Sequence, residues 1–174
     1  MPVLSVGHRV IINNNPILRN TAQSGQPGGG IRAYNCNILD NLVISNSGGL
    51  GGGIWSEHGT VKHNVVAWNQ GTSGGGINAY DTDVSRNTVV GNSGDPAGLF
   101  LNFCNLTEET AIHNTVAYNT APQGGVGGVT VIAATHDWNC PSHDEQLFFR
   151  SNNVFGNTDF ALRNAMSSAL SRMV

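Results

Sequence analysis

The chain has 174 residues, of which only 11% are charged, and its formal net charge is −3. Lys62 is its one lysine, so there is no basic stripe of the kind that binds nucleic acid. The apolar runs are far shorter than a membrane span, and Met1–Val10 lacks the basic and apolar blocks of a signal peptide. We therefore expect no nucleic-acid partner and no membrane span.

A repeat organises the chain. The tetrapeptide GGGI ends at Ile31, Ile54 and Ile77, which are 23 residues apart in each case. An Asn-x-x-x-x-Asn element follows each GGGI, and the same element recurs throughout the chain: Asn15/Asn20, Asn41/Asn46, Asn64/Asn69, Asn87/Asn92, Asn114/Asn119 and Asn152/Asn157. A fixed period in this range predicts a solenoid of stacked turns. The 23 glycines then fit the turns between short strands, where glycine supplies positive φ without strain.

The first element of each repeat predicts a strand, because apolar residues alternate with others. Two rows are expected to point inward: Ile31, Ile54, Ile77, Leu99 and Val129, then Ala33, Ser56, Ala79, Leu101 and Val131. Two rows are expected to point outward: Arg32, Trp55, Asn78, Phe100 and Thr130, then Tyr34, Glu57, Tyr80, Asn102 and Ile132. One face of the solenoid should thus carry aromatic and polar side chains.

Two further strands per repeat flank the first asparagine of each pair. Their predicted inward residues are Ile12, Ile38, Val61, Val84, Ala111 and Phe149 before it, and Ile17, Val43, Val66, Val89, Val116 and Val154 after it. Asparagine tolerates the left-handed backbone of a sharp turn. Its amide is also both donor and acceptor, so equivalent asparagines about 4.8 Å apart can bond from turn to turn.

Two insertions break the period, near Cys104–Thr110 and near Ala133–Leu147. Both follow the first strand of a repeat, so they should lie near each other, on a face that often binds in solenoids. Cys104 and Cys140 could then pair, or both could be free thiols. We interpret the polar second insertion as an ordinary surface loop. The alternative is that its side chains bind a metal ion. We expect no metal and no cofactor.

The tail, residues 158–174, changes period. Phe160, Leu162, Met166 and Met173 fall at helical spacing. We predict a helix there that caps the open end of a solenoid spanning residues 1–157. The alternative is a helix that joins two copies in a homodimer.

The alternation of GGGI with Asn-x-Val-x-x-Asn resembles the right-handed parallel β-helix proteins of the pectate-lyase-like superfamily. It is most similar to the GGxI and xxN repeats of polymorphic-outer-membrane-like surface proteins, and the similarity covers about Ile12–Asn157. The resemblance implies an all-β, single-stranded right-handed parallel β-helix of about six coils. It also implies a secreted or cell-surface location. It implies no particular activity, since one fold hosts many.

Two functional hypotheses remain open. The first is a non-catalytic module or scaffold that binds carbohydrate or protein, such as a polysaccharide or a surface partner, because flat aromatics beside polar groups stack on sugar rings. Its expected binding residues are Arg32, Tyr34, Trp55, Asn78, Tyr80 and Asn102. The second is a polysaccharide hydrolase or lyase with carboxylates in a groove along the first strands. Its expected catalytic residues are Glu57, Asp81 and Asp83.

Overall fold

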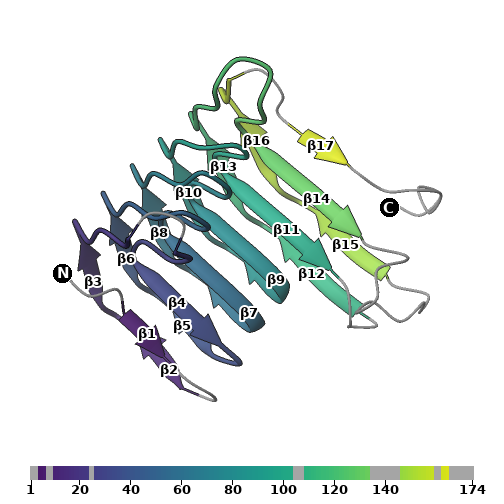
Figure 1. Ribbon diagram of the computed structural model, residues 1–174. Helices are drawn as coiled ribbons and strands as arrows, with labels where there is room; N and C mark the ends of the chain where they lie inside the picture. The colour runs from purple at the N-terminus through teal and green to yellow at the C-terminus, as the bar shows by residue number, and fades with distance from the viewer. Residues whose placement is uncertain are drawn as a thin grey trace.

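The computed structural model describes residues 4–6, 10–23, 26–103, 108–133, 146–158 and 162–164. These residues form a parallel β-solenoid, in which the strands of successive turns lie side by side along one axis (Figure 1). Every strand pair in the described residues is parallel, and those residues contain no helix. The first and last strands lie at opposite ends of the stack.

Each turn contributes strands in up to three places. The first place is taken by β1 (Leu4–Val6), β4 (Ile31–Tyr34), β7 (Ile54–Lys62), β9 (Ile77–Ser85), β11 (Leu99–Phe103), β14 (Val129–Ala133) and β17 (Leu162–Asn164). The second is taken by β2 (Ile11–Asn13), β5 (Asn37–Leu39), β12 (Glu108–Ile112) and β15 (Gln146–Arg150). The third is taken by β3 (Pro16–Leu18), β6 (Leu42–Ile44), β8 (Val65–Ala67), β10 (Thr88–Val90), β13 (Thr115–Ala117) and β16 (Asn153–Phe155). Strands β7 and β9 run through the first corner and fill the second place as well, since β5 pairs with the later part of β7.

The predicted register between turns is confirmed. Ile31 pairs with Ile54, Ile54 with Ile77, Ile77 with Leu99, and Leu99 with Val129. The solenoid has about four full turns, each with a neighbouring turn on both sides, and a partial turn at each end. The prediction of about six coils was therefore too high. The stacking spreads the core over several turns, so each turn depends on its neighbours for burial.

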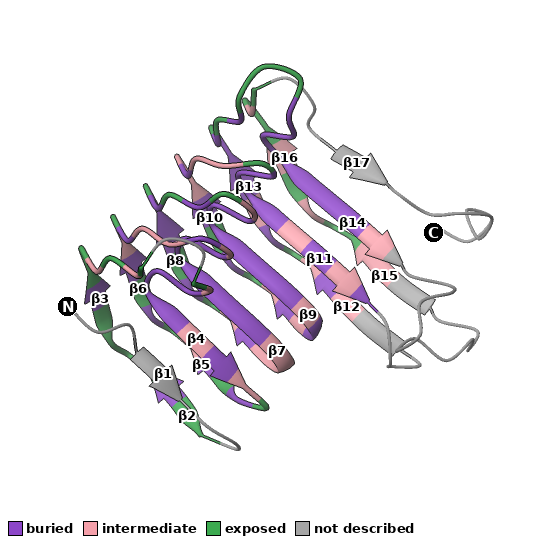
Figure 2. Ribbon diagram, viewed as in Figure 1, coloured by how far each residue is buried: buried purple, intermediate pink, exposed green. Residues whose placement is uncertain are grey.

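The core consists mainly of aliphatic side chains. Figure 2 shows buried residues in the strands of successive turns along the stack. Both predicted inward rows of the first strands are buried, as are the inward residues of the other two strands in the central turns. Phe149 and Val154 of the last turn are only partly buried and pack against this core. The exposed residues concentrate at the corners and on the outer side of the six-stranded sheet that runs from β3 to β16.

The corners differ from the sequence prediction in one respect. The residue with positive φ is the one before each paired asparagine, not the asparagine itself: Asn14, Arg19, Asp40, Ser45, His63, Trp68, Arg86, Gly91, His113, Tyr118, Ser151 and Gly156. This conformation costs a residue that has a side chain roughly 1–2 kcal/mol. The paired asparagine that follows points its amide into the solenoid, and in the central turns it is 0–2% exposed.

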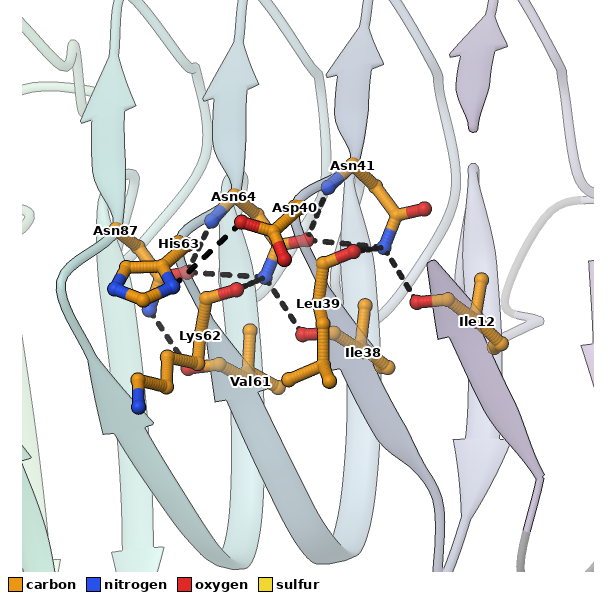
Figure 3. Close-up of polar contacts among 10 residues, drawn as sticks. All are labelled: Ile12, Ile38, Leu39, Asp40, Asn41, Val61, Lys62, His63, Asn64 and Asn87. Atoms are coloured by element: carbon orange, nitrogen blue, oxygen red, sulfur yellow. Dashed lines mark hydrogen bonds and ion pairs between the residues drawn. The ribbon is translucent and has the colours of Figure 1, made fainter. Parts of the chain in front are cut away.

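The paired asparagines form two columns of stacked amides. We call Asn15, Asn41, Asn64, Asn87, Asn114 and Asn152 the first column, and Asn20, Asn46, Asn69, Asn92, Asn119 and Asn157 the second. Both the backbone N–H and the Nδ2 of Asn64 donate to Oδ1 of Asn87, at 2.9 and 3.0 Å. Nδ2 of Asn64 also donates to the carbonyl of Ile38 in the previous turn, at 2.9 Å (Figure 3). Every buried amide in the columns is thus satisfied along the axis.

The columns stay in register although the turns differ in length. Successive members of the first column are 26, 23, 23, 27 and 38 residues apart. The backbone N–H of the earlier asparagine nevertheless lies 2.9–3.0 Å from Oδ1 of the later one at each step. Most of the additional residues of the two long turns fall between β11 and β12 and between β14 and β15.

The glycine loops play two roles. Gly28, Gly51 and Gly74 have φ of 72°, 61° and 62°, as the turn prediction requires. The last glycine before the strand is needed for space instead: a Cβ added at Gly53 would lie 2.7 Å from the carbonyl oxygen of Gly76. The loops of neighbouring turns therefore pack backbone against backbone, closer than any side chain would permit.

The helical cap predicted for residues 158–174 is not confirmed. Most of that tail lies outside the described residues, and Leu162–Asn164 forms strand β17, which pairs with β14. Cys104 and Cys140 also lie outside the described residues. Cys36 is buried, and its thiol donates to the carbonyl oxygen of Tyr34 at 2.9 Å.

Candidate functional site

The expected binding residues come together on the outer side of four consecutive strands, β4, β7, β9 and β11. The backbone register places them in two rows, Arg32–Trp55–Asn78–Phe100 and Tyr34–Glu57–Tyr80–Asn102. We call these eight residues the aromatic face. Adjacent strands in a sheet are about 4.8 Å apart, so the two rows together form a strip about four strands wide.

The aromatic rings of this face touch one another across the turns. The ring centroids of Tyr34 and Trp55 are 4.8 Å apart, those of Trp55 and Tyr80 are 6.0 Å apart, and those of Tyr80 and Phe100 are 6.1 Å apart. The tilted and edge-on geometries are those that aromatic pairs favour. The Arg32 guanidinium lies 5.6 Å from the ring centre of Tyr34 and 5.5 Å from that of Trp55, within cation–π range.

The face is more enclosed than strand alternation predicts. Trp55 is 6% exposed and Asn78 is fully buried, whereas Arg32, Tyr34, Tyr80, Phe100 and Asn102 are half-buried. The half-buried residues therefore form the accessible part of the face. Trp55 and Asn78 form its enclosed part.

Several buried polar atoms of this face have no hydrogen-bond partner among the described residues: Nε of Arg32, Nε1 of Trp55, both side-chain polar atoms of Asn78, and Oδ1 of Asn102. No other described residue has such an atom. A buried polar group without a partner costs about 1–3 kcal/mol. The contrast with the satisfied asparagine columns marks this face as the place where the fold leaves hydrogen-bonding capacity unused.

Tyr80 lies at the centre of the aromatic face. Burial raises the pKa of its hydroxyl above the ordinary value of 10.0, and the nearby Glu57 carboxylate acts in the same direction. The Asn78 amide opposes the shift, although it makes no hydrogen bond of standard geometry with any described residue.

The expected catalytic residues separate into two groups. His58 links Glu57 and Asp81: its Nε2 lies 3.6 Å from a Glu57 carboxylate oxygen, and its Nδ1 lies 3.6 Å from one of Asp81. The Asp81 side chain is 5% exposed, that of Glu57 31% and that of His58 37%. Asp83 is used elsewhere, since its carboxylate accepts hydrogen bonds from the backbone N–H and the hydroxyl of Thr110 at 2.9 and 2.8 Å.

Two large aromatics were not expected as site residues. Trp68 and Tyr118 are 65% and 61% exposed and directly follow β8 and β13 of the six-stranded sheet, not the sheet that carries the aromatic face. Each directly precedes an asparagine of the second column. An aromatic ring next to a repeated asparagine, where the other turns carry arginine, serine or glycine, is the sequence signal that could have found them.

Within the described residues, no group of three or more histidine, cysteine, aspartate or glutamate side chains is placed to hold a metal ion. None of those residues belongs to a helix that could span a membrane. Comparisons with protein-family models, with curated proteins and with solved structures give no match. The similarity to the surface-protein repeats therefore depends on the repeat pattern alone.

Proposed function

We propose that the protein is a carbohydrate-binding β-solenoid and that the aromatic face is its binding surface. The observation that carries this proposal is the set of unpartnered polar atoms of Arg32, Trp55, Asn78 and Asn102 among contacting aromatic rings. A sugar offers both a flat apolar face and hydroxyl groups that donate and accept. It therefore matches a surface that combines rings with unused hydrogen-bonding capacity.

The half-buried residues would make the first contact with the ligand. Tyr34, Tyr80 and Phe100 offer ring surface, and Arg32 and Asn102 offer polar groups at the two ends of the strip. A shift of the tyrosine rings would bring sugar hydroxyls within reach of Asn78 and the Trp55 indole. The resemblance to repeats of bacterial surface proteins fits a module that meets polysaccharide outside the cell, and the proposal includes that location.

The test compares two asparagines that are equally buried. Asn78 and Asn92 are both 0% exposed, but of the two only the Asn92 amide makes hydrogen bonds of standard geometry, in the second column. Replacing an unpartnered polar group by an apolar one of similar shape is neutral or stabilising. Asn78→Leu should thus leave urea stability unchanged or raised and weaken sugar binding. Asn92→Leu should destabilise the fold.

Binding is measured by calorimetry with the soluble cello-, chito- or pectic oligosaccharides that score on a glycan array. Weaker binding by Asn78→Leu with undiminished stability supports the proposal. Unchanged binding, or a stability loss as large as that of Asn92→Leu, contradicts it.

A second candidate function is that of a polysaccharide hydrolase or lyase. The observation that favours it is His58, which lies between the enclosed Asp81 and the more exposed Glu57. Two carboxylates in different environments can serve as acid and base in glycoside cleavage. Release of reducing sugar that Glu57→Gln abolishes and Asp83→Asn leaves intact would support this function. No release from any oligosaccharide that binds would favour a module without catalysis.

A further inference from the structure

The corner before the second asparagine column has an unusual set of residues. In turn order they are Arg19, Ser45, Trp68, Gly91, Tyr118 and Gly156, and all have positive φ. Glycine adopts this conformation freely, whereas a bulky residue there is an outlier. Trp68, at φ 52°, and Tyr118, at φ 55°, are the bulkiest of the six.

Folding gains little from these two rings. Trp68 is 65% exposed and Tyr118 is 61% exposed, so neither contributes much apolar burial to the core. The positive φ of these corners suits glycine, which the chain uses in the turn after each ring, at Gly91 and Gly156. Positive φ is common to all these corners, so what sets the two positions apart is a large aromatic ring that stays mostly exposed.

Each ring lies against a glycine of the next turn. A Cβ added at Gly91 would come within 2.7 Å of Cδ1 of Trp68, and one added at Gly156 within 2.7 Å of Cε1 of Tyr118. Tyr118 also contacts the edge of Phe155, with ring centroids 5.4 Å apart. The glycines leave the space in which the rings settle on the surface, and the large exposed area leaves the other side of each ring open.

The two rings are two turns apart. Strand β8 pairs with β10, and β10 pairs with β13, so Trp68 and Tyr118 are separated by two strand spacings, about 9.5 Å. Hydrogen-bonding side chains form a parallel row two residues further along the chain: Thr21, Ser47, Gln70, Ser93 and Thr120. Aromatic platforms with polar side chains beside them can stack on sugar rings and bind their hydroxyls.

We propose that Trp68 and Tyr118 form a second carbohydrate-binding site, which takes an extended β-linked polysaccharide chain of the cellulose or chitin type. In such a chain every second sugar presents the same face, and the two-turn separation of the rings suits sugars related in this way. The site uses no residue of the aromatic face. It therefore goes beyond the function proposed above and can be tested independently of the aromatic face.

The experiment uses substitutions that the fold already contains at equivalent corners. Trp68→Ser copies Ser45, and Tyr118→Gly copies Gly91 and Gly156. The matched control is His113→Ser, which copies Ser151 at the other positive-φ corner, where His113 is also exposed. The probes are microcrystalline cellulose and chitin powder in a depletion assay, with urea unfolding of each variant alongside.

We expect each single variant to bind the powder at least tenfold more weakly and the double variant to lose retention. Their unfolding midpoints should equal or exceed that of the unmodified chain, and His113→Ser should bind normally. Unchanged retention of the double variant, or absence of retention in the unmodified chain, overturns the proposal. A fall in the unfolding midpoint of both single variants also overturns it, because the rings would then serve the fold. Retention that survives Asn78→Leu separates this site from the aromatic face.

Discussion

Removing one amide from the middle of a column should destabilise the protein far more than removing one from its end. Asn64 is 1% exposed, and its side chain takes part in five hydrogen bonds. Asn64→Ala takes away the acceptor of the Asn41 backbone N–H at 2.9 Å and a donor to the Ile38 carbonyl at 2.9 Å. The remaining partners keep other bonds: Oδ1 of Asn87, for example, still accepts from the Asn64 backbone.

The magnitude follows from those two losses. A buried N–H left without an acceptor costs about 1–3 kcal/mol, and one lost bond to a carbonyl adds about 0.5–1.5 kcal/mol. We therefore expect Asn64→Ala to lower the free energy of unfolding by about 2–4 kcal/mol. Equilibrium urea unfolding followed by far-UV circular dichroism measures this change, with the slope against urea unchanged if the folded state stays intact.

Asn15→Ala is the matched control. Asn15 belongs to the same column but is exposed in the first turn, where its Nδ2 donates to the Asn13 carbonyl at 2.9 Å and to Oδ1 of Asn41 at 3.2 Å. Its loss should cost about 1 kcal/mol or less, since water replaces these bonds. Equal effects of the two substitutions would refute the reasoning that buried stacking makes the column stabilising.

Three further predictions test other parts of the structure. Gly53→Ala should cost about 1–3 kcal/mol or more in urea unfolding, because its Cβ would overlap the backbone of the next turn, whereas Gly124→Asn, in open space, should be tolerated. The free energy of unfolding should fall as pH rises above about 10, because Tyr80 ionises there more readily in the unfolded chain than in the folded one. Tyr80→Phe should reduce that alkaline loss, and an unchanged pH profile would count against burial as its cause. Asp83→Ala should lower stability by about 1.5–3 kcal/mol through loss of its bonds to Thr110 and leave sugar binding intact, which calorimetry can check.

The repeat made the stacking of the core predictable. Ile31, Ile54 and Ile77 are the same residue at the same spacing. Such a repeat is expected when the three side chains stack on one another in the core, as the structure shows. The paired asparagines carried the same information about the polar part of the interior. The extent of the stack was less predictable, because the terminal turns pack on one side only and the period fades there.

Chemistry at the corners could not be predicted in the same way. The residues before the asparagines share no chemical character, since Asp40, Ser45, His63 and Arg86 all occur there. The constraint lies in the backbone, and the sequence does not record it as a residue preference. Likewise, Asp81 and Asp83 look equivalent in the chain, but one lies beside His58 and the other binds the next turn.

The unequal turn lengths have an implication for how such a chain can change. The asparagine columns depend on where a turn re-enters the stack and not on the path it takes outside, so 38 residues serve as well as 23 between column members. Residues inserted at the first corner therefore leave the hydrogen bonds between the stacked asparagines unchanged. A lineage, or a protein engineer, can exchange whole loops there and obtain new surfaces on an unaltered frame.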